Sequence, residues 1–173
     1  MDLLDPKVDF VFKRIFGSEE NKDVLLRFLN DALTDPVTSI SLVNPYIDKD
    51  ALEDKQSVLD IKAVTSKGEQ INIEIQLSNE YDMEKRTLYY WAKLYEEQMQ
   101  EGEEYRDLKK TITINILDFD MVDNHQYHNI FHLREDTTHI LLTEDIEIHI
   151  MELCKLEEEH YDLSDRLTKW LLF

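Results

Sequence analysis

The chain has 173 residues, of which 42% are hydrophobic and 33% are charged, proportions that exclude a disordered acidic polymer and allow one domain with a real core. The formal net charge of −19 opposes nucleic-acid binding by the molecule as a whole, because phosphate backbones prefer basic surfaces. The acidity is concentrated toward the C-terminus, since residues 135–165 hold eleven Asp or Glu and one Lys, so the N-terminal half can still present a local basic face.

Two helices are predicted in the first 35 residues. Apolar side chains follow helical spacing across residues 7–16, and Gly17 is predicted to end this helix. A second helix is predicted over 19–33 with Ser18 as its N-cap. Asp35 precedes a proline and therefore avoids the helical region, which ends the second helix.

Three strand-like runs follow, at 40–44, 57–65 and 70–77. The third alternates cleanly, with isoleucine and leucine on one side and Asn72, Glu74 and Gln76 on the other. A short turn, SKGE with Gly68, separates the second and third runs, so these two are predicted to form a hairpin.

The rest of the chain is predicted to hold a long helix, three strands and a helical tail. The helix covers 82–100, and its apolar stripe is predicted to contain Leu88, Trp91, Ala92, Tyr95 and Met99. A strong strand at 111–119 is followed by weaker ones near 127–134 and 138–150, and residues 152–173 have a helical pattern.

The predicted hairpin collects polar side chains that could carry chemistry. Strand side chains alternate, so Asp60 and Lys62 share one face and Glu74 and Gln76 share one face, with Asp60 close to Glu74. Two adjacent carboxylates repel each other unless a divalent cation lies between them, and such a cation suits phosphodiester hydrolysis. From periodicity alone, two carboxylates on solvated strand faces are the more ordinary interpretation.

Several segments resemble a known family when they are taken in order. They are DPKVDFVFKRIFG at 5–17, SVLDIKA at 57–63, GEQINIEIQ at 68–76, RTLYYWAKLYEEQMQEGEEY at 86–105 and ITINILDF at 112–119. Together they resemble the PD-(D/E)XK nuclease superfamily, and within it the recombination-promoting nuclease and transposase (Rpn-type) family. The resemblance implies an α/β fold, a restriction-endonuclease-like core in which helices flank a mixed central β-sheet. We expect this nuclease-like domain to span residues 1–150, and residues 151–173 to form a C-terminal helical segment, the start of a truncated region.

The resemblance also implies roles for individual residues. Asp60 and Glu74 are expected to bind Mg²⁺ or Mn²⁺, whereas Gln76 occupies the position where the superfamily usually has Lys. A neutral Gln can orient a water but cannot offset developing negative charge. Lys62 is a candidate for the missing cation, the alternative being a solvated surface lysine. Asp9 is a candidate additional metal ligand, the alternative being an acid that complements the helix dipole.

DNA contacts are expected from two helices. Lys13 and Arg14 on the first helix could touch phosphates, and Arg86 and Tyr90, four apart and off the predicted apolar stripe of the long helix, could line a DNA groove. Solvated side chains, with Arg86 stacked on Tyr90, are the ordinary alternative.

Other kinds of site are not expected. His125, His128 and His132 should scatter onto different faces of a strand and turn, which argues against a zinc site. The sequence has no Gly-rich phosphate loop, so no nucleotide cofactor is expected. Cys154 lies among apolar residues and is interpreted as packing rather than as a nucleophile.

The expected function is that of an Mg²⁺-dependent DNA endonuclease in recombination or transposition. Two alternatives stay open: a catalytically weak or inactive binding module, favoured by Gln76 and the charge of −19, and a phage-defence or toxin nuclease with the same chemistry. A single cysteine, the absence of a signal-peptide pattern and the absence of a long apolar run predict a cytoplasmic protein without a membrane partner. Cutting both DNA strands needs two active sites, which makes a homodimer compatible with this function.

Overall fold

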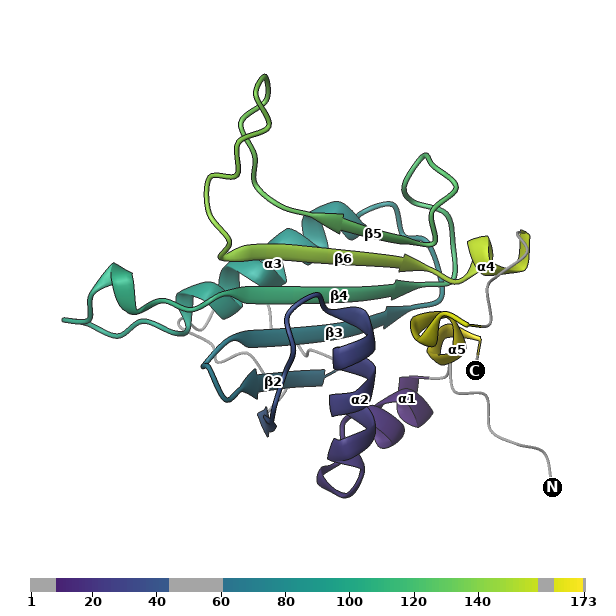
Figure 1. The fold of residues 1–173 in the computed structure, drawn as a ribbon, viewed down its shortest axis with the longest axis horizontal. Coiled ribbons are helices and arrows are strands. Elements are labelled where there is room, and N and C mark those ends of the chain that lie inside the picture. Colours follow the sequence, from purple (N-terminus) through teal and green to yellow (C-terminus); the bar gives the residue numbers. More distant parts are fainter. Residues whose placement is uncertain (1–8, 44–60, 159–163, 173) are drawn as a thin grey trace.

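The computed structural model describes residues 9–43, 61–158 and 164–172, and its centre is a six-stranded mixed sheet (Figure 1). The strands are β1 (Ile40–Val43), β2 (Ile61–Thr65), β3 (Gln70–Gln76), β4 (Thr111–Leu117), β5 (His128–Phe131) and β6 (Ile146–Glu152). Their order across the sheet is β1-β2-β3-β4-β6-β5. The pairs β1–β2, β2–β3 and β5–β6 are antiparallel, whereas β3, β4 and β6 run parallel. The predicted α/β class with a mixed central sheet is therefore confirmed.

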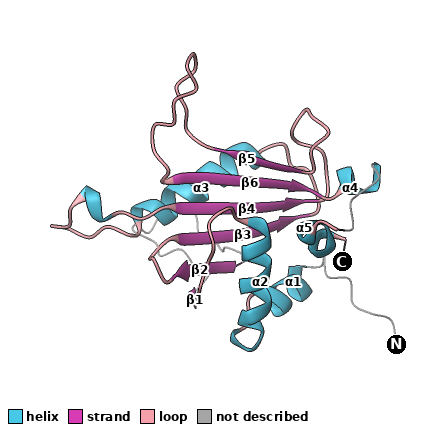
Figure 2. Ribbon diagram, viewed as in Figure 1, coloured by secondary structure: helices cyan, strands magenta, loops and turns pink. Residues whose placement is uncertain are grey.

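Helices cover both faces of this sheet (Figure 2). They are α1 (Asp9–Phe16), α2 (Lys22–Ala32), α3 (Met83–Glu96), α4 (Cys154–Glu158) and α5 (Arg166–Leu171), with short 3-10 turns η1 (Glu19–Asn21) and η2 (Tyr105–Asp107). A parallel pair of strands needs a crossover connection, and α3 provides it between β3 and β4. Trp91 Nε1 of α3 donates to the Thr111 carbonyl at 3.0 Å, which fixes the helix against the start of β4. None of the helices in the described ranges has the length and hydropathy that a bilayer crossing needs.

The main apolar core lies between the sheet and the layer formed by α1, α2 and α5. Isoleucines at alternate positions of β3 and β4 point into it, and Phe12 of α1 and Leu167 and Leu171 of α5 are buried in the same cluster. Trp170 meets the ring of Phe28 edge to face, with centroids 6.1 Å apart. The residues after 150 thus pack on the same sheet as those before it.

The opposite face of the sheet, beneath α3, is polar. Asn72, Thr113 and Asn115 are buried there. Thr87 of α3 lies 3.2 Å from Thr113, oxygen to oxygen, and accepts a hydrogen bond from Asn115 Nδ2 at 3.0 Å. Hydrogen bonding between helix and sheet therefore replaces part of the apolar contact expected at such an interface.

The predicted hairpin is confirmed for the part of it that the structure describes. β2 and β3 pair through the turn at 66–69, where the amide of Gly68 donates to the carbonyl of Thr65 at 2.9 Å. Gly68 has φ +87°, a conformation that favours glycine. Residues 57–60 of the predicted strand lie outside the described residues.

Four predicted elements were wrong in detail. The helix predicted from residue 19 begins only at Lys22 after the turn η1, and Asn21, not Ser18, is at its N-cap position. Residues 152–173 do not form one helix, since α4 and α5 are separate. The strand predicted at 138–150 begins only at Ile146, because the preceding residues form the returning strand of a projecting hairpin. The predicted stripe of α3 was also wrong: its buried residues are Met83, Thr87, Tyr90 and Leu94, whereas Leu88 is 50% exposed.

Candidate metal and nucleic-acid site

Glu74 is the best-defined member of the predicted site. It lies on β3, points toward α3, and is only 1% exposed. Arg86, in the first turn of α3, donates from Nη2 to Glu74 Oε2 at 3.1 Å. Because a buried carboxylate is costly without a counter-charge, this guanidinium stabilises the ionised form of Glu74.

The ring of Tyr90 contacts the guanidinium of this ion pair. The Arg86 guanidinium carbon lies 5.5 Å from the centroid of the Tyr90 ring, within the range of a cation–π contact. The side chain of Arg86 is 32% exposed, whereas Tyr90 is only 8% exposed. The prediction that Tyr90 lies off the buried face of the long helix is therefore wrong, because the helix packs on a polar sheet face that accommodates the tyrosine.

Gln76 is the last residue of β3 and shares the face of Glu74. Its Nε2 donates to the carbonyl of Ser78 at 3.0 Å, so Oε1 is the end of the amide directed away from that carbonyl. The backbone carbonyl of Gln76 accepts from the amide of Asp118, at the end of the neighbouring strand. Gln76 thus presents an oxygen that can orient a water or coordinate a hard cation.

Lys62 is directed away from Glu74. Its neighbour on β3 is Asn72, and Nζ forms a partly buried ion pair with Glu97, which follows the last turn of α3. Arg86 and Glu97 are separated by about 16 Å along the helix axis. The cation beside Glu74 is therefore Arg86, and Lys62 ties the other end of α3 to the sheet.

The two other predicted metal ligands are not described. The β2–β3 register is defined from Ile61↔Ile73 onward, and Asp60 lies outside the described residues. Asp9 is the first residue of α1, but its side chain is also outside them. Within the described ranges, no group of three His, Cys, Asp or Glu side chains could hold a metal ion.

The predicted DNA contacts lie on two layers of the fold. Lys13 and Arg14 belong to α1, which packs through Phe12 on the apolar face, whereas Arg86 lies on the polar face. The end of α1 nevertheless reaches β2, because a Cβ added at Gly17 would lie 3.3 Å from Cγ1 of Ile61. The structure therefore brings together Glu74, Gln76, Arg86 and Tyr90, and leaves Lys13 and Arg14 across the sheet.

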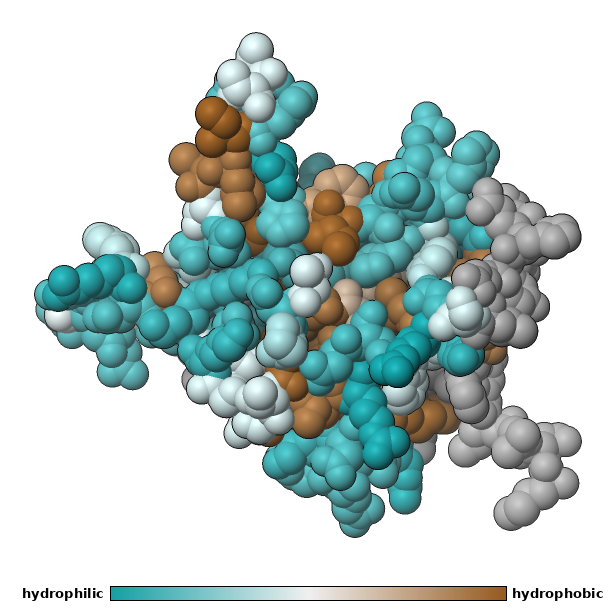
Figure 3. Space-filling model, viewed as in Figure 1, coloured by the Kyte–Doolittle hydropathy of each residue, from teal (hydrophilic) through white to brown (hydrophobic). Residues whose placement is uncertain are grey.

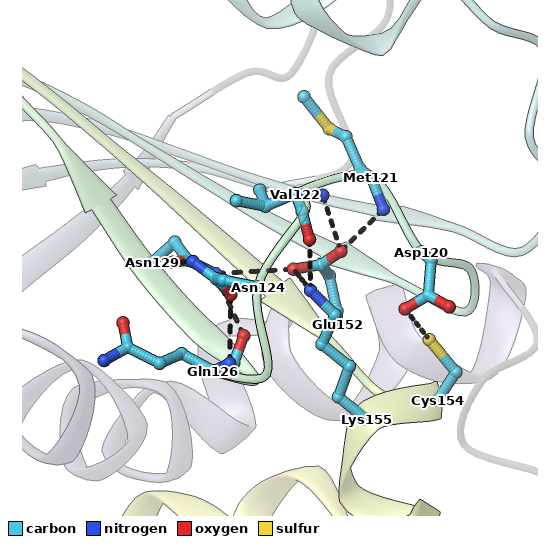
Figure 4. A network of polar contacts seen from close by, with 9 residues as sticks. All are labelled: Asp120, Met121, Val122, Asn124, Gln126, Asn129, Glu152, Cys154 and Lys155. Carbon is cyan, nitrogen blue, oxygen red and sulfur yellow. Dashed lines mark hydrogen bonds and ion pairs between the residues drawn. The ribbon is translucent and has the colours of Figure 1, made fainter.

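A second buried carboxylate lies where the parallel strands β3, β4 and β6 end. Glu152 ends β6 and accepts from the backbone amides of Met121 and Val122, at 2.6 and 2.9 Å, and from Lys155 Nζ at 2.8 Å (Figure 4). Its neighbour on β4 is Leu117, and the neighbour of Leu117 on β3 is Gln76. Glu152 therefore fixes the loop after β4 at the edge where Gln76 lies.

The histidines form a chain of hydrogen bonds on the apolar face. His128 Nε2 lies 2.8 Å from His149 Nδ1, and His149 Nε2 lies 2.7 Å from Glu147 Oε1. His132 contacts the other oxygen of Glu147 at 3.2 Å, and Lys110 pairs with it at 2.5 Å. The expected scatter is wrong for His128 and His132, because positions four apart along a strand keep the same side.

Charge and burial explain the pKa shifts of His128 and Glu147 in this hydrogen-bonded chain and of Cys154 after β6. Burial, followed by the neighbouring His149, lowers the pKa of His128 to about 4. Burial alone would raise the pKa of Glu147, but its hydrogen bonds to His149 and Lys110 outweigh burial and bring it to about 2. Burial raises the pKa of Cys154 to about 11, and its Sγ donates to Asp120 at 3.3 Å, so this thiol is a poor nucleophile as predicted.

A family model described as PD-(D/E)XK nuclease family transposase matches residues 6–173. The chain belongs to this family. No curated protein and no solved structure shows significant similarity to the chain. Membership agrees with the mixed sheet flanked by helices, and it covers both the hairpin and the C-terminal helices.

Sequence reasoning assigned the family but missed two features of the site. It predicted that Arg86 contacts DNA and did not predict its ion pair with Glu74. The ion pair could have been inferred, because a crossover helix that begins soon after β3 must pass back over that strand. It also missed Glu152, because in an alternating strand a glutamate is normally interpreted as solvated. No local signal marks the backbone amides that surround this carboxylate.

Proposed function

We propose that the chain is an Mg²⁺- or Mn²⁺-dependent DNA endonuclease that acts in recombination or transposition in the cytoplasm. Family membership supports nuclease chemistry in general. The observation that carries the proposal is the buried carboxylate of Glu74, held beside the amide of Gln76 at the edge of the sheet and balanced by a partly exposed arginine. Such carboxylate and amide oxygens are the donors that hard divalent cations prefer.

Asp60 and Glu74 would hold the cation. Asp60 immediately precedes Ile61, whose partner on β3 is Ile73, the residue before Glu74. Asp9, at the start of α1, is the candidate for a further ligand. The cation would supply Lewis-acid stabilisation of the phosphate and activation of a water.

The remaining steps belong to the protein side chains. Gln76 Oε1 orients the attacking water by accepting one of its protons in a hydrogen bond. Arg86 supplies the positive charge that Gln76 lacks, and its exposed third can contact a phosphate oxygen while Tyr90 holds the guanidinium in place. Lys13 and Arg14 lie on α1, whose Phe12 packs on the opposite face of the sheet from Glu74, and would contact phosphates farther along the DNA.

A plasmid-nicking assay with Mg²⁺ or Mn²⁺ tests the proposal. Wild-type protein should nick supercoiled DNA, whereas Asp60→Asn and Glu74→Gln should lose at least about a hundredfold in rate, as expected when charge stabilisation of the transition state is removed. Glu20→Gln, the same kind of change at an exposed residue, is the matched control and should leave the rate unchanged. Equal rates for all four proteins would exclude the assignment.

A second candidate function is a family member that binds DNA or protein without cutting. The neutral Gln76 and the net charge of −19 favour it, since both weaken stabilisation of a phosphate. Calorimetric titration with Mg²⁺ and Mn²⁺ separates the two, because a non-catalytic module should show no divalent-cation binding above background. A phage-defence or toxin nuclease would share the chemistry, and its genomic neighbours would distinguish that role from transposition.

A further inference from the structure

A two-stranded arm projects beyond the sheet between β5 and β6 (Figure 1). The amide of Leu142 donates to the carbonyl of Leu133 at 3.0 Å, and the amide of Glu135 donates to the carbonyl of Ile140 at 2.9 Å. Arg134 pairs with Leu141 between these two bonded pairs. Residues 133–142 therefore form a short antiparallel hairpin held by one bridge and these two hydrogen bonds, which we call the arm.

One face of the arm is apolar and exposed. Opposite residues in an antiparallel pair, and alternate residues along each strand, point to the same side, so Leu133, Ile140 and Leu142 share a face. Glu135 lies on this side too, but its carboxylate bonds to the backbone amides of the tip. Their exposed fractions are 48%, 67% and 74%, and Phe131 at the base of the arm adds a ring that is 44% exposed. Hydrophobic side chains gather on the arm below its polar tip (Figure 3).

Hydrogen bonds order the tip of the arm. The carboxylate of Glu135 accepts from the backbone amides of Thr137 and Thr138 and from the Thr138 hydroxyl. Arg134 Nη1 donates to the carbonyl of His139, whose φ of 57° closes the turn. A two-stranded ribbon is marginal in water by itself, so an ordered tip above an uncovered apolar face is typical of a preorganised binding element.

We propose that the arm is the homodimer interface of this protein, with the arm of a second copy as its occupant. Taking about 200 Å² for each large side chain, the four exposed residues leave roughly 450 Å² of apolar surface per copy. Two arms would cover about 900 Å² before any backbone or polar contact is counted, close to the roughly 1,000 Å² that a specific interface needs.

Charge favours a second copy at this place. The molecule carries −19, so two copies repel each other over most of their surfaces. Residues 128–143 contain one Arg and two acids, Glu135 and Asp136, a net charge of −1. Two apolar ribbons packed face to face also bury the same residues from each copy, as a two-fold axis requires. The need for two active sites on duplex DNA adds to this argument and rests on the proposed nuclease function.

Sedimentation analysis between about 1 µM and about 1 mM tests the interface. The wild type should be a dimer whose dissociation constant rises at least tenfold in Ile140→Gln/Leu142→Gln and, independently, in Leu133→Gln on the other strand. Leu88→Gln, at a comparably exposed leucine of α3, is the matched control and should dimerise like the wild type. Far-UV circular dichroism verifies that each variant is folded, and if one arm variant is unfolded the other decides the result.

Two outcomes would overturn the inference. One is a wild-type monomer throughout the range, which would leave the arm to a different kind of protein. The other is a dimer that both arm substitutions leave intact. The plasmid-nicking assay keeps this inference separate from the proposed function: a dimer that never nicks DNA retains the arm interface and refutes the nuclease, and a monomer that nicks does the reverse.

Discussion

Arg86→Met tests the charge balance at Glu74. Methionine retains much of the apolar stem of Arg86 and removes the guanidinium, so the carboxylate of Glu74, 1% exposed, loses the charge that donates to it at 3.1 Å. Removing one partner of a buried ion pair costs about 3–5 kcal/mol, and because Arg86 is 32% exposed we reduce this to about 2–3 kcal/mol. In a domain of this size that loss lowers the midpoint of thermal unfolding by about 5–10 °C.

A divalent cation should restore part of this loss. If Glu74 helps to hold Mg²⁺, the cation replaces the missing positive charge, and binding to the folded state alone stabilises it by about 1.4 kcal/mol at ten times the dissociation constant. Thermal unfolding in EDTA and in Mg²⁺ should therefore show a larger Mg²⁺ shift for Arg86→Met than for the wild type.

The control for this experiment lies on the same helix. Lys85 is an exposed lysine in the first turn of α3, so Lys85→Met should cost less than about 1 kcal/mol. An unchanged midpoint for Arg86→Met would refute the stabilising ion pair. A lowered midpoint with the same Mg²⁺ shift as the wild type would refute cation binding at Glu74.

Three further predictions concern stability. Glu152→Ala leaves two backbone amides and the buried Lys155 ammonium without their carboxylate and should cost about 3–5 kcal/mol in urea unfolding; adding Lys155→Met should recover part of this loss, and additive losses would contradict the pairing. Gly17→Ala should cost about 1–3 kcal/mol by the same assay, because the new Cβ would lie 2.7 Å from the carbonyl oxygen of Lys13; a neutral result would mean that the helix end moves freely. Burial lowers the pKa of His128 from 6.5 to about 4, so the unfolded chain binds a proton at a higher pH than the folded one, and stability should fall as the pH drops from about 6.5 to about 4. His128→Asn should reduce the difference between the urea unfolding midpoints at pH 7 and pH 4.5. An unchanged difference would assign the pH dependence to other groups.

The sheet around the site was predictable because its signals are local. Alternation in β3 and the glycine turn at Gly68 determine which residues of the hairpin share a face, and they place Glu74 and Gln76 together correctly. These signals need no knowledge of what packs on the strand.

The helix over the site was not predictable in the same way. A hydropathy stripe assumes an apolar surface beneath the helix, but α3 packs on Asn72, Thr113 and Asn115. The residues it buries therefore include Thr87 and Tyr90, and Leu88 is left half exposed. The arm misled prediction for the opposite reason, because its exposed isoleucine and leucine residues resemble a core strand.

Two buried carboxylates on the α3 face of the described residues, Glu74 and Glu152, differ in what balances their charge. Glu152 is held by backbone amides and by Lys155, donors that belong to the folded chain and are themselves buried or fixed in a loop. Glu74 is paired with a guanidinium that is one third exposed. A cation can therefore share or replace the counter-charge at Glu74 with little rearrangement, whereas at Glu152 it would have to break the network that fixes the loop. Thermal unfolding should reflect this difference. Mg²⁺ should raise the unfolding midpoint of Arg86→Met by more than that of the wild type. Lys155→Met removes the corresponding cation at Glu152, and its midpoint should rise with Mg²⁺ only as much as that of the wild type.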